Sequence, residues 1–93
     1  MFSSRRIVAV HVGPRKDRIS GMWSAHNFWA RITFEIKDHF FAKPREWEGL
    51  FHYHGGWREV ESGQALNYHE MKRVDESIAR LKALADQMEG KLT

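Results

Sequence analysis

The chain has 93 residues, a length that suits one domain. Of these residues 42% are hydrophobic and 13% aromatic, which is enough to form a hydrophobic core and excludes wholesale disorder. It has no cysteine, which excludes disulfides, thiolate zinc sites and cysteine nucleophiles. The net charge of +3 is uneven, because residues 1–45 hold nine Lys or Arg against three Asp or Glu, whereas residues 46–93 hold six against nine. We therefore expect an anionic partner to bind the N-terminal half.

The first expected element is a mostly buried strand at about 6–12, where β-branched residues dominate until a Gly-Pro pair ends the run. In this strand Val8, Val10 and Val12 alternate with the intervening residues. The run is too short to cross a membrane and carries His11, so it fits neither a signal peptide nor a membrane span. We expect a cytoplasmic protein with no membrane partner.

The second expected strand covers about 22–37, and its clearest part begins at Phe28. Every even position from Phe28 to Ile36 is apolar. The odd positions hold Trp29, Arg31, Thr33, Glu35 and Lys37. This period of two predicts one face on the core and the other face in water or against a partner.

A β-hairpin is expected next, with strands at about 47–54 and 57–61 after a loop that contains Pro44. Gly55 and Gly56 lie between the two strands, and a type I′ turn needs positive φ at both of its central residues. The pattern therefore predicts a tight two-residue turn.

The last expected element is a helix at about 68–89, because apolar residues recur at alternating spacings of three and four. These residues are Met71, Val74, Ile78, Leu81, Ala85, Met88 and Leu92. Asn67 and Glu70 have the spacing of a capping box at the start, and Gly90 is expected to cap the end. The elements predict one α+β domain over 1–93: an antiparallel meander of three to four strands with the long C-terminal amphipathic helix packed across one face.

Basic residues gather near the N-terminus and could neutralise phosphates. They are Arg5, Arg6, Arg15, Lys16 and Arg18. On the outward strand face, Trp29 could stack on a base, with Arg31 and Lys37 beside it. The alternative is that Trp29 covers an edge of the core and that the charges are simply solvated.

The segment 29–38 (WARITFEIKD), followed by 47–51 (WEGLF) and a later amphipathic helix, resembles the sheet-plus-helix of AP2-type and integrase-arm DNA-binding domains. The resemblance covers about half of the chain and implies that outward Arg and Trp side chains of the sheet enter the major groove. The hairpin at His54–Trp57, placed before the helix, departs from the pattern of that family.

The histidines are a second candidate constellation. His52 and His54 would share one face of a strand, and His39 or His69 could complete a transition-metal site. Because such pairs are common on exposed strands, we expect no metal and no other cofactor, and a His-based metal-binding protein stays an alternative. The sequence also lacks phosphate-binding loop, HExxH and GxSxG motifs, so a non-enzymatic binding protein is predicted.

Two partner classes remain open, and charge placement favours nucleic acid. The alternative is a protein-binding module, such as a phage or mobile-element accessory or inhibitor protein that docks on a host protein or nucleoprotein complex, because four Trp suit an interface hot spot. A second copy of the chain is a further candidate partner, which would bind through apolar surface that the core does not bury. A parallel coiled coil is not favoured, because Glu70 would face Asp75 and Leu84 would face Glu89.

Overall fold

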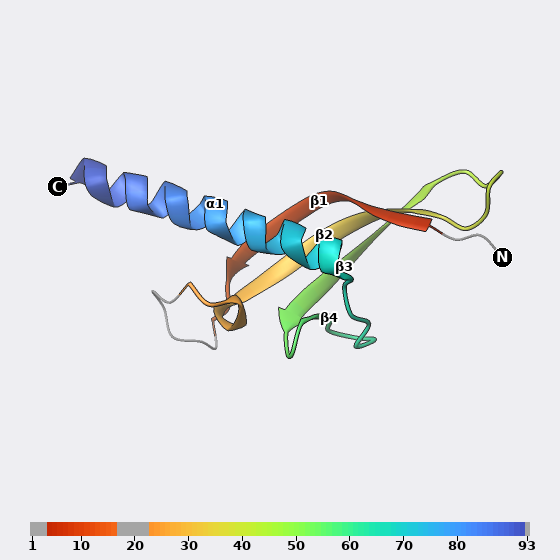
Figure 1. Ribbon diagram of the computed structural model, residues 1–93, viewed down its shortest axis with the longest axis horizontal. Helices are drawn as coiled ribbons and strands as arrows, with labels where there is room; N and C mark the ends of the chain where they lie inside the picture. The colour runs from red at the N-terminus through yellow and green to blue at the C-terminus, as the bar shows by residue number, and fades with distance from the viewer. Residues whose placement is uncertain (1–3, 17–22, 93) are drawn as a thin grey trace.

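The computed structural model describes residues 4–16 and 23–92, with side chains described up to Glu89. Four strands form one antiparallel sheet in chain order, and a long helix lies across one of its faces (Figure 1). The elements are β1 (Ser4–Pro14), η1 (Ala25–Asn27), β2 (Phe28–Lys37), β3 (Arg45–Tyr53), β4 (Trp57–Glu59) and α1 (Tyr68–Leu92). The predicted α+β meander with a C-terminal helix is confirmed. Among the described residues, no helix is both long enough and apolar enough to cross a bilayer.

The start of the second predicted strand is wrong, because the chain forms the 3₁₀ turn η1 immediately before β2. The Ser24 hydroxyl accepts a hydrogen bond from the His26 N–H at 3.3 Å, and the Asn27 N–H donates to the Ser24 carbonyl at 3.0 Å. A serine that caps a local turn in this way competes with strand pairing. The predicted limit at Met22 lies outside the described residues.

Two further boundaries differ from prediction around β4. Three residues, 54–56, separate the paired Tyr53 and Trp57, although two had been predicted in the turn. Gly55 and Gly56 both have positive φ, at 63° and 122°. The strand β4 ends at Glu59 and not at residue 61, because the Glu59 carboxylate accepts hydrogen bonds from the backbone N–H groups of Glu61 and Ser62 and so begins a turn.

A β-bulge in β1 decides which side chains of that strand face α1. Ile7 pairs with Phe34 and Ala9 pairs with Thr33, so Val8 is the extra residue and is 37% exposed. The predicted alternation of Val8, Val10 and Val12 with the intervening residues therefore fails at Val8, since the bulge shifts the following residues to the opposite faces and places Val10 and Val12 on the same face as Ile7.

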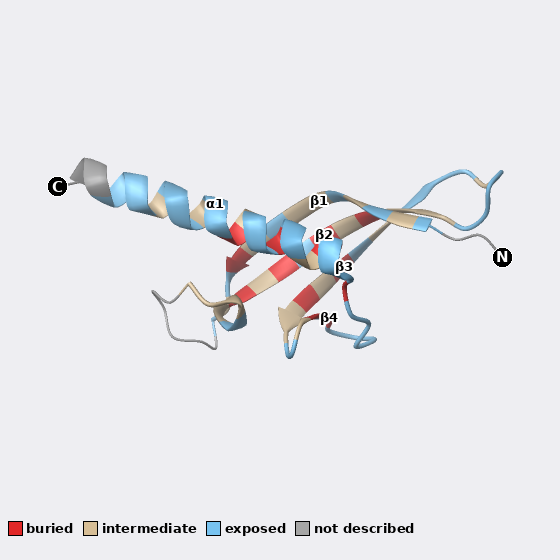
Figure 2. Ribbon diagram, in the orientation of Figure 1, coloured by how far each residue is buried: buried red, intermediate tan, exposed pale blue. Residues whose placement is uncertain are grey.

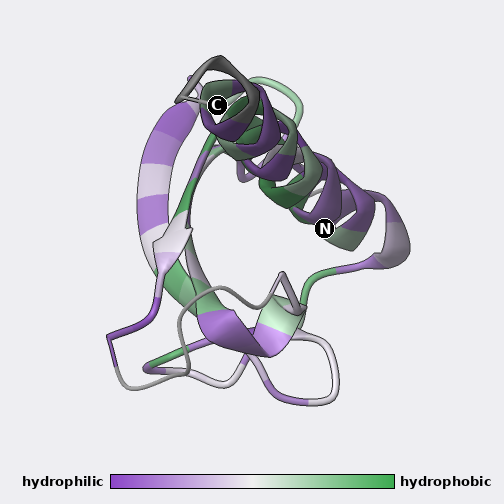
Figure 3. Ribbon diagram, turned by 90° about the vertical axis from the view of Figure 1, so that its left-hand side faces the viewer, coloured by the Kyte–Doolittle hydropathy of each residue, from purple (hydrophilic) through white to green (hydrophobic). Residues whose placement is uncertain are grey.

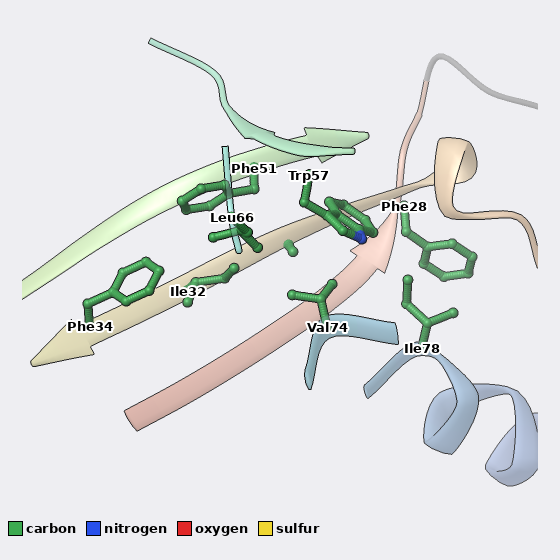
Figure 4. Packing of buried hydrophobic residues seen from close by; sticks show 9 residues of the cluster. Phe28, Ile32, Phe34, Phe51, Trp57, Leu66, Val74 and Ile78 are labelled. Carbon is green, nitrogen blue, oxygen red and sulfur yellow. The ribbon is translucent and has the colours of Figure 1, made fainter. Parts of the chain in front are cut away.

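The core lies between α1 and the sheet face that α1 covers (Figure 4). Its buried members are Phe28, Ala30, Ile32, Phe34, Phe51, Trp57, Leu66, Val74 and Ile78. Three of the four Trp serve this core: Trp57 is fully buried, Trp23 stacks on Phe28 with ring centroids 5.3 Å apart, and Trp47 packs on Phe34 at 5.8 Å. The Trp57 indole also donates to Asp75 of α1 at 3.3 Å.

The predicted capping box at the start of α1 is present. The Asn67 N–H donates to Glu70 Oε1, and the Glu70 N–H donates to Asn67 Oδ1, both at 2.9 Å. The same Glu70 oxygen accepts a hydrogen bond from Arg5 of β1 at 2.7 Å. One carboxylate thus caps the helix and ties it to the first strand.

Only the first half of α1 packs on the sheet, and the second half extends beyond it (Figures 1 and 2). Val74 and Ile78 are buried and Leu81 is partly buried against the core, whereas Leu84 and Met88 are 57% and 65% exposed. We call residues 82–89 the projecting half. The expectation that the whole apolar stripe packs on the sheet is wrong, and so is the predicted cap at Gly90, because α1 continues to Leu92.

Candidate nucleic-acid interface

The sheet face turned away from α1, here called the outer face, is not covered by any element that the structure describes (Figures 1 and 3). Residues paired directly across antiparallel strands project to the same face, so the strand register defines its members. They are Arg6, Ala9, His11 and Gly13 from β1, Trp29, Arg31, Thr33, Glu35 and Lys37 from β2, Glu46, Glu48, Leu50 and His52 from β3, and Arg58 from β4.

Trp29 lies at the centre of one end of the outer face. Its indole covers the backbone of Gly13 on β1: a Cβ built on Gly13 would lie only 2.7 Å from Cε2 of Trp29. The Arg31 guanidinium lies over the indole, 5.7 Å from the ring centroid. Trp29 remains partly accessible and Arg31 is exposed. A large aromatic ring is therefore packed against the backbone of Gly13 with a cation over it.

Three further basic or histidine side chains lie near Trp29 on this face, and none of them is among the predicted nucleic-acid-binding residues. His52 is paired with Trp29, Arg58 is paired with His52, and His11 is paired with Arg31. Arg58 is held by hydrogen bonds to the carbonyls of His54 and Gly63, at 3.1 and 3.4 Å, and these partners leave its charge uncancelled. The signal that could have located them is the strand register, and for His11 that register depends on the bulge in β1.

The carboxylates of the outer face lie from the middle of the sheet, where Glu48 contacts Arg31, to its other end. Glu35 pairs with Arg6 at 3.2 Å, and this contact raises the pKa of Arg6. Glu48 pairs with Arg31 at 3.2 Å, with both side chains more than half exposed. Because exposed ion pairs are worth only about 0–1 kcal/mol, a phosphate can compete with Glu48 for Arg31. The outer face is thus cationic and aromatic at one end and mixed in charge at the other.

The predicted binding residues are distributed over three places. Arg15 and Lys16 follow β1 at the Trp29 end, where the Arg15 N–H donates to the Asn27 carbonyl at 2.8 Å. Lys37 is not beside Trp29: it lies eight positions further along the strand, about 26 Å away. Arg5 is on the helix side, where it pairs with Glu70 and lies over the Phe34 ring at 5.0 Å. Arg6 shares the far end with Glu35, and Arg18 lies outside the described residues.

The histidines do not assemble a metal site within the part of the chain that the structure describes, where no group of three or more His, Asp or Glu side chains could hold an ion. His52 and His54 are neighbours, with ring centroids 6.4 Å apart. His69 lies on α1, where its ring contacts Tyr68.

A separate exposed feature lies at the loop between β2 and β3. Phe40 and Phe41 are 67% and 89% exposed, and their rings meet edge to face with centroids 5.0 Å apart. The Lys37 amine lies over Phe40, 5.4 Å from the ring centroid. Below the loop, Arg45 donates to both carboxylate oxygens of Asp38, and this hydrogen bonding lowers the Asp38 pKa. The ion pair of Asp38 and Arg45 thus closes the base of a loop whose two phenyl rings are exposed to solvent.

Comparison with known proteins provides no relative. No family model, no curated protein and no solved structure matches this chain. The functional argument therefore rests on the geometry of the outer face and of the projecting features.

Proposed function

We propose that the protein binds single-stranded nucleic acid on the Trp29 end of the outer face. The observation that carries the proposal is the Trp29 indole, which lies across Gly13 with the Arg31 guanidinium beside it on an uncovered sheet surface. Aromatic side chains displayed on a sheet stack on bases, and nearby cations hold the phosphates.

The dimensions of the site support a single strand. The cross-strand row of Gly13, Trp29, His52 and Arg58 spans three strand spacings, about 14 Å, which accommodates two or three nucleotides across the sheet. A base must be unpaired to stack on the indole, whereas a duplex presents its phosphates and groove edges. Arg15 and Lys16 lie at one edge of this row and add positive charge.

The test is fluorescence anisotropy with labelled single- and double-stranded oligonucleotides at low and near-physiological salt. Trp29→Leu should weaken binding of the single strand about 5- to 150-fold, because base stacking is worth about 1–3 kcal/mol. The matched control is Tyr68→Leu, since Tyr68 is an exposed aromatic residue on α1. Absence of binding at low salt, or equal affinity in both variants, would overturn the proposal.

A second candidate function is docking on a larger protein, and the exposed pair of Phe40 and Phe41 favours it. Contiguous exposed aromatic surface is typical of protein interfaces. Core packing of Trp23, Trp47 and Trp57 weakens the original reason for this candidate, which was the number of Trp. Phe40→Ser with Phe41→Ser separates the two functions, because this double variant should bind oligonucleotides as the unaltered protein does.

A further inference from the structure

The projecting half of α1 exposes an apolar stripe that its own sheet does not cover. Leu81 is the last residue of the stripe packed against the core, and beyond it Leu84 and Met88 are more than half exposed. Ala85 and Met88 continue the three-four spacing of the stripe into the projecting half, and Leu84 lies beside them and widens it. The surface suits another helix laid along it.

We propose that this stripe pairs antiparallel with the projecting half of a second copy of the chain. Lys82 and Glu89 flank one side of the stripe, seven residues apart, and they lie equally far from the midpoint between Ala85 and Asp86. A two-fold axis at that midpoint places Lys82 of each copy opposite Glu89 of the other, which forms two complementary pairs. The same axis places Leu84 of each copy at the level of Gln87 of the other, so the two Leu84 residues lie about 4.5 Å apart along the helix axis.

A cavity at the point where α1 leaves the sheet fits this arrangement. It has a volume of about 290 Å³ and is lined by Trp23, Ala25, Asp75, Ile78, Ala79 and Lys82. The two-fold axis brings Glu89 of the second copy to the level of Lys82, at the rim of the cavity, and Met88 to the level of Ala83. The apolar walls of Trp23, Ala25 and Ile78 can then receive the end of the second helix, so the interface is larger than the helix pair alone.

The antiparallel arrangement is favoured over a parallel one by charge. In a parallel pair, Leu84 of one helix faces Glu89 of the other, and Lys82 keeps only its exposed pair with Asp86 of its own helix, at 3.2 Å. Pairing two short helical segments buries less surface than a standard stable interface, so we expect a dimer that dissociates on dilution. The pairing uses α1 and leaves the outer face uncovered, which makes it independent of the proposed nucleic-acid binding.

The first experiment is sedimentation velocity over a wide concentration range. Lys82→Glu alone and Glu89→Lys alone should each weaken the dimer roughly tenfold or more, since both cross-pairs become repulsive. An equimolar mixture of the two variants should form a heterodimer, because each copy then offers the charges that the other lacks. Lys72→Glu and Glu76→Lys are the matched controls, as both are exposed on the first half of α1.

The second experiment uses the absence of native cysteine. Leu84→Cys should give a disulfide-linked dimer under mild oxidation, whereas Ala83→Cys, on the adjacent face of α1, should remain monomeric. A monomer at every concentration, or cross-linking that is equal at the two positions, overturns the proposal. A dimer that persists unchanged in both charge variants overturns the antiparallel arrangement. Circular dichroism checks that each variant keeps its helix.

Discussion

The indole of Trp29 occupies the space in which a side chain on Gly13 would stand, with Cε2 only 2.7 Å from a Cβ built there. This relationship makes Gly13 a positioning residue for the proposed site, because an added methyl group must displace the ring. Gly13→Ala should lower single-strand affinity several-fold while costing about 1 kcal/mol of stability. Anisotropy titration and urea unfolding measure the two effects, and unchanged affinity would contradict the assigned role of the ring.

Removal of one carboxylate should strengthen the proposed site. Glu48 pairs with Arg31 at 3.2 Å, so Glu48→Gln frees the guanidinium beside Trp29 for a phosphate. We expect oligonucleotide affinity to rise several-fold, with a steeper dependence on salt concentration. Glu46→Gln makes the same change in net charge at the far end of the outer face and is the control. Equal gains in both variants would indicate a nonspecific effect of charge.

Substitutions at the contact between β1 and α1 should strongly lower the free energy of unfolding. Glu70 is 7% exposed, accepts the Asn67 N–H and pairs with Arg5. Glu70→Ala should lower the free energy of unfolding by about 2 kcal/mol, since it removes a cap and leaves a partly buried guanidinium without its carboxylate. Glu76→Ala, at an exposed helix position, should change it by less than about 0.5 kcal/mol in the same urea titration.

The two halves of α1 should respond differently to truncation of apolar side chains. Ile78→Ala should cost about 2–5 kcal/mol, because Ile78 is 7% exposed within the core. Met88→Ala, at a position 65% exposed, should cost less than about 0.5 kcal/mol in a dilute sample. Unfolding at low protein concentration measures the difference, and equal costs would mean that the second half packs on its own sheet.

Acid should destabilise the turn after β4. Hydrogen bonds from the backbone N–H groups of Glu61 and Ser62 lower the pKa of Glu59. A lowered pKa in the folded state contributes stability that is present above the unfolded value of about 4.3 and is lost as pH falls through the folded pKa.

In Glu59→Gln the free energy of unfolding should therefore increase less steeply with pH between about pH 3 and pH 5. Asp38, whose pKa is also lowered, should leave a residual slope. Urea unfolding across this range provides the measurement, and Glu61→Gln is the exposed control. A slope that is identical in Glu59→Gln and in the unaltered protein would contradict this account.

Local patterns in the sequence were sufficient for most of the fold. The period of two in β2 and the capping box of Asn67 and Glu70 are short-range features, and both predictions are confirmed. The bulge at Val8 was not predictable in this way, because it depends on which residue of β2 each residue of β1 meets. Without that register, Arg5 could not be assigned to the helix side, nor His11 to the outer face.

The candidate site was predictable only in part for the same reason. Trp29 and Arg31 lie two apart on one strand, so their proximity follows from the period of two. The approach of Gly13, His52 and Arg58 to Trp29 comes from other strands and from pairings that no local pattern fixes. The extent of α1 beyond the sheet was missed because the apolar spacing is the same on covered and uncovered turns.

The bond between Arg5 and Glu70 also has a consequence for the order in which the chain folds. It joins residues 65 positions apart, so the strand that it secures is synthesised well before the helix. Until α1 is available, the apolar side of the meander has no cover, and such exposed surface on a nascent chain favours aggregation. We therefore expect the cooperative folding step to be the docking of α1, so that ribosome-bound chains lacking 68–92 remain open to proteases and chaperones.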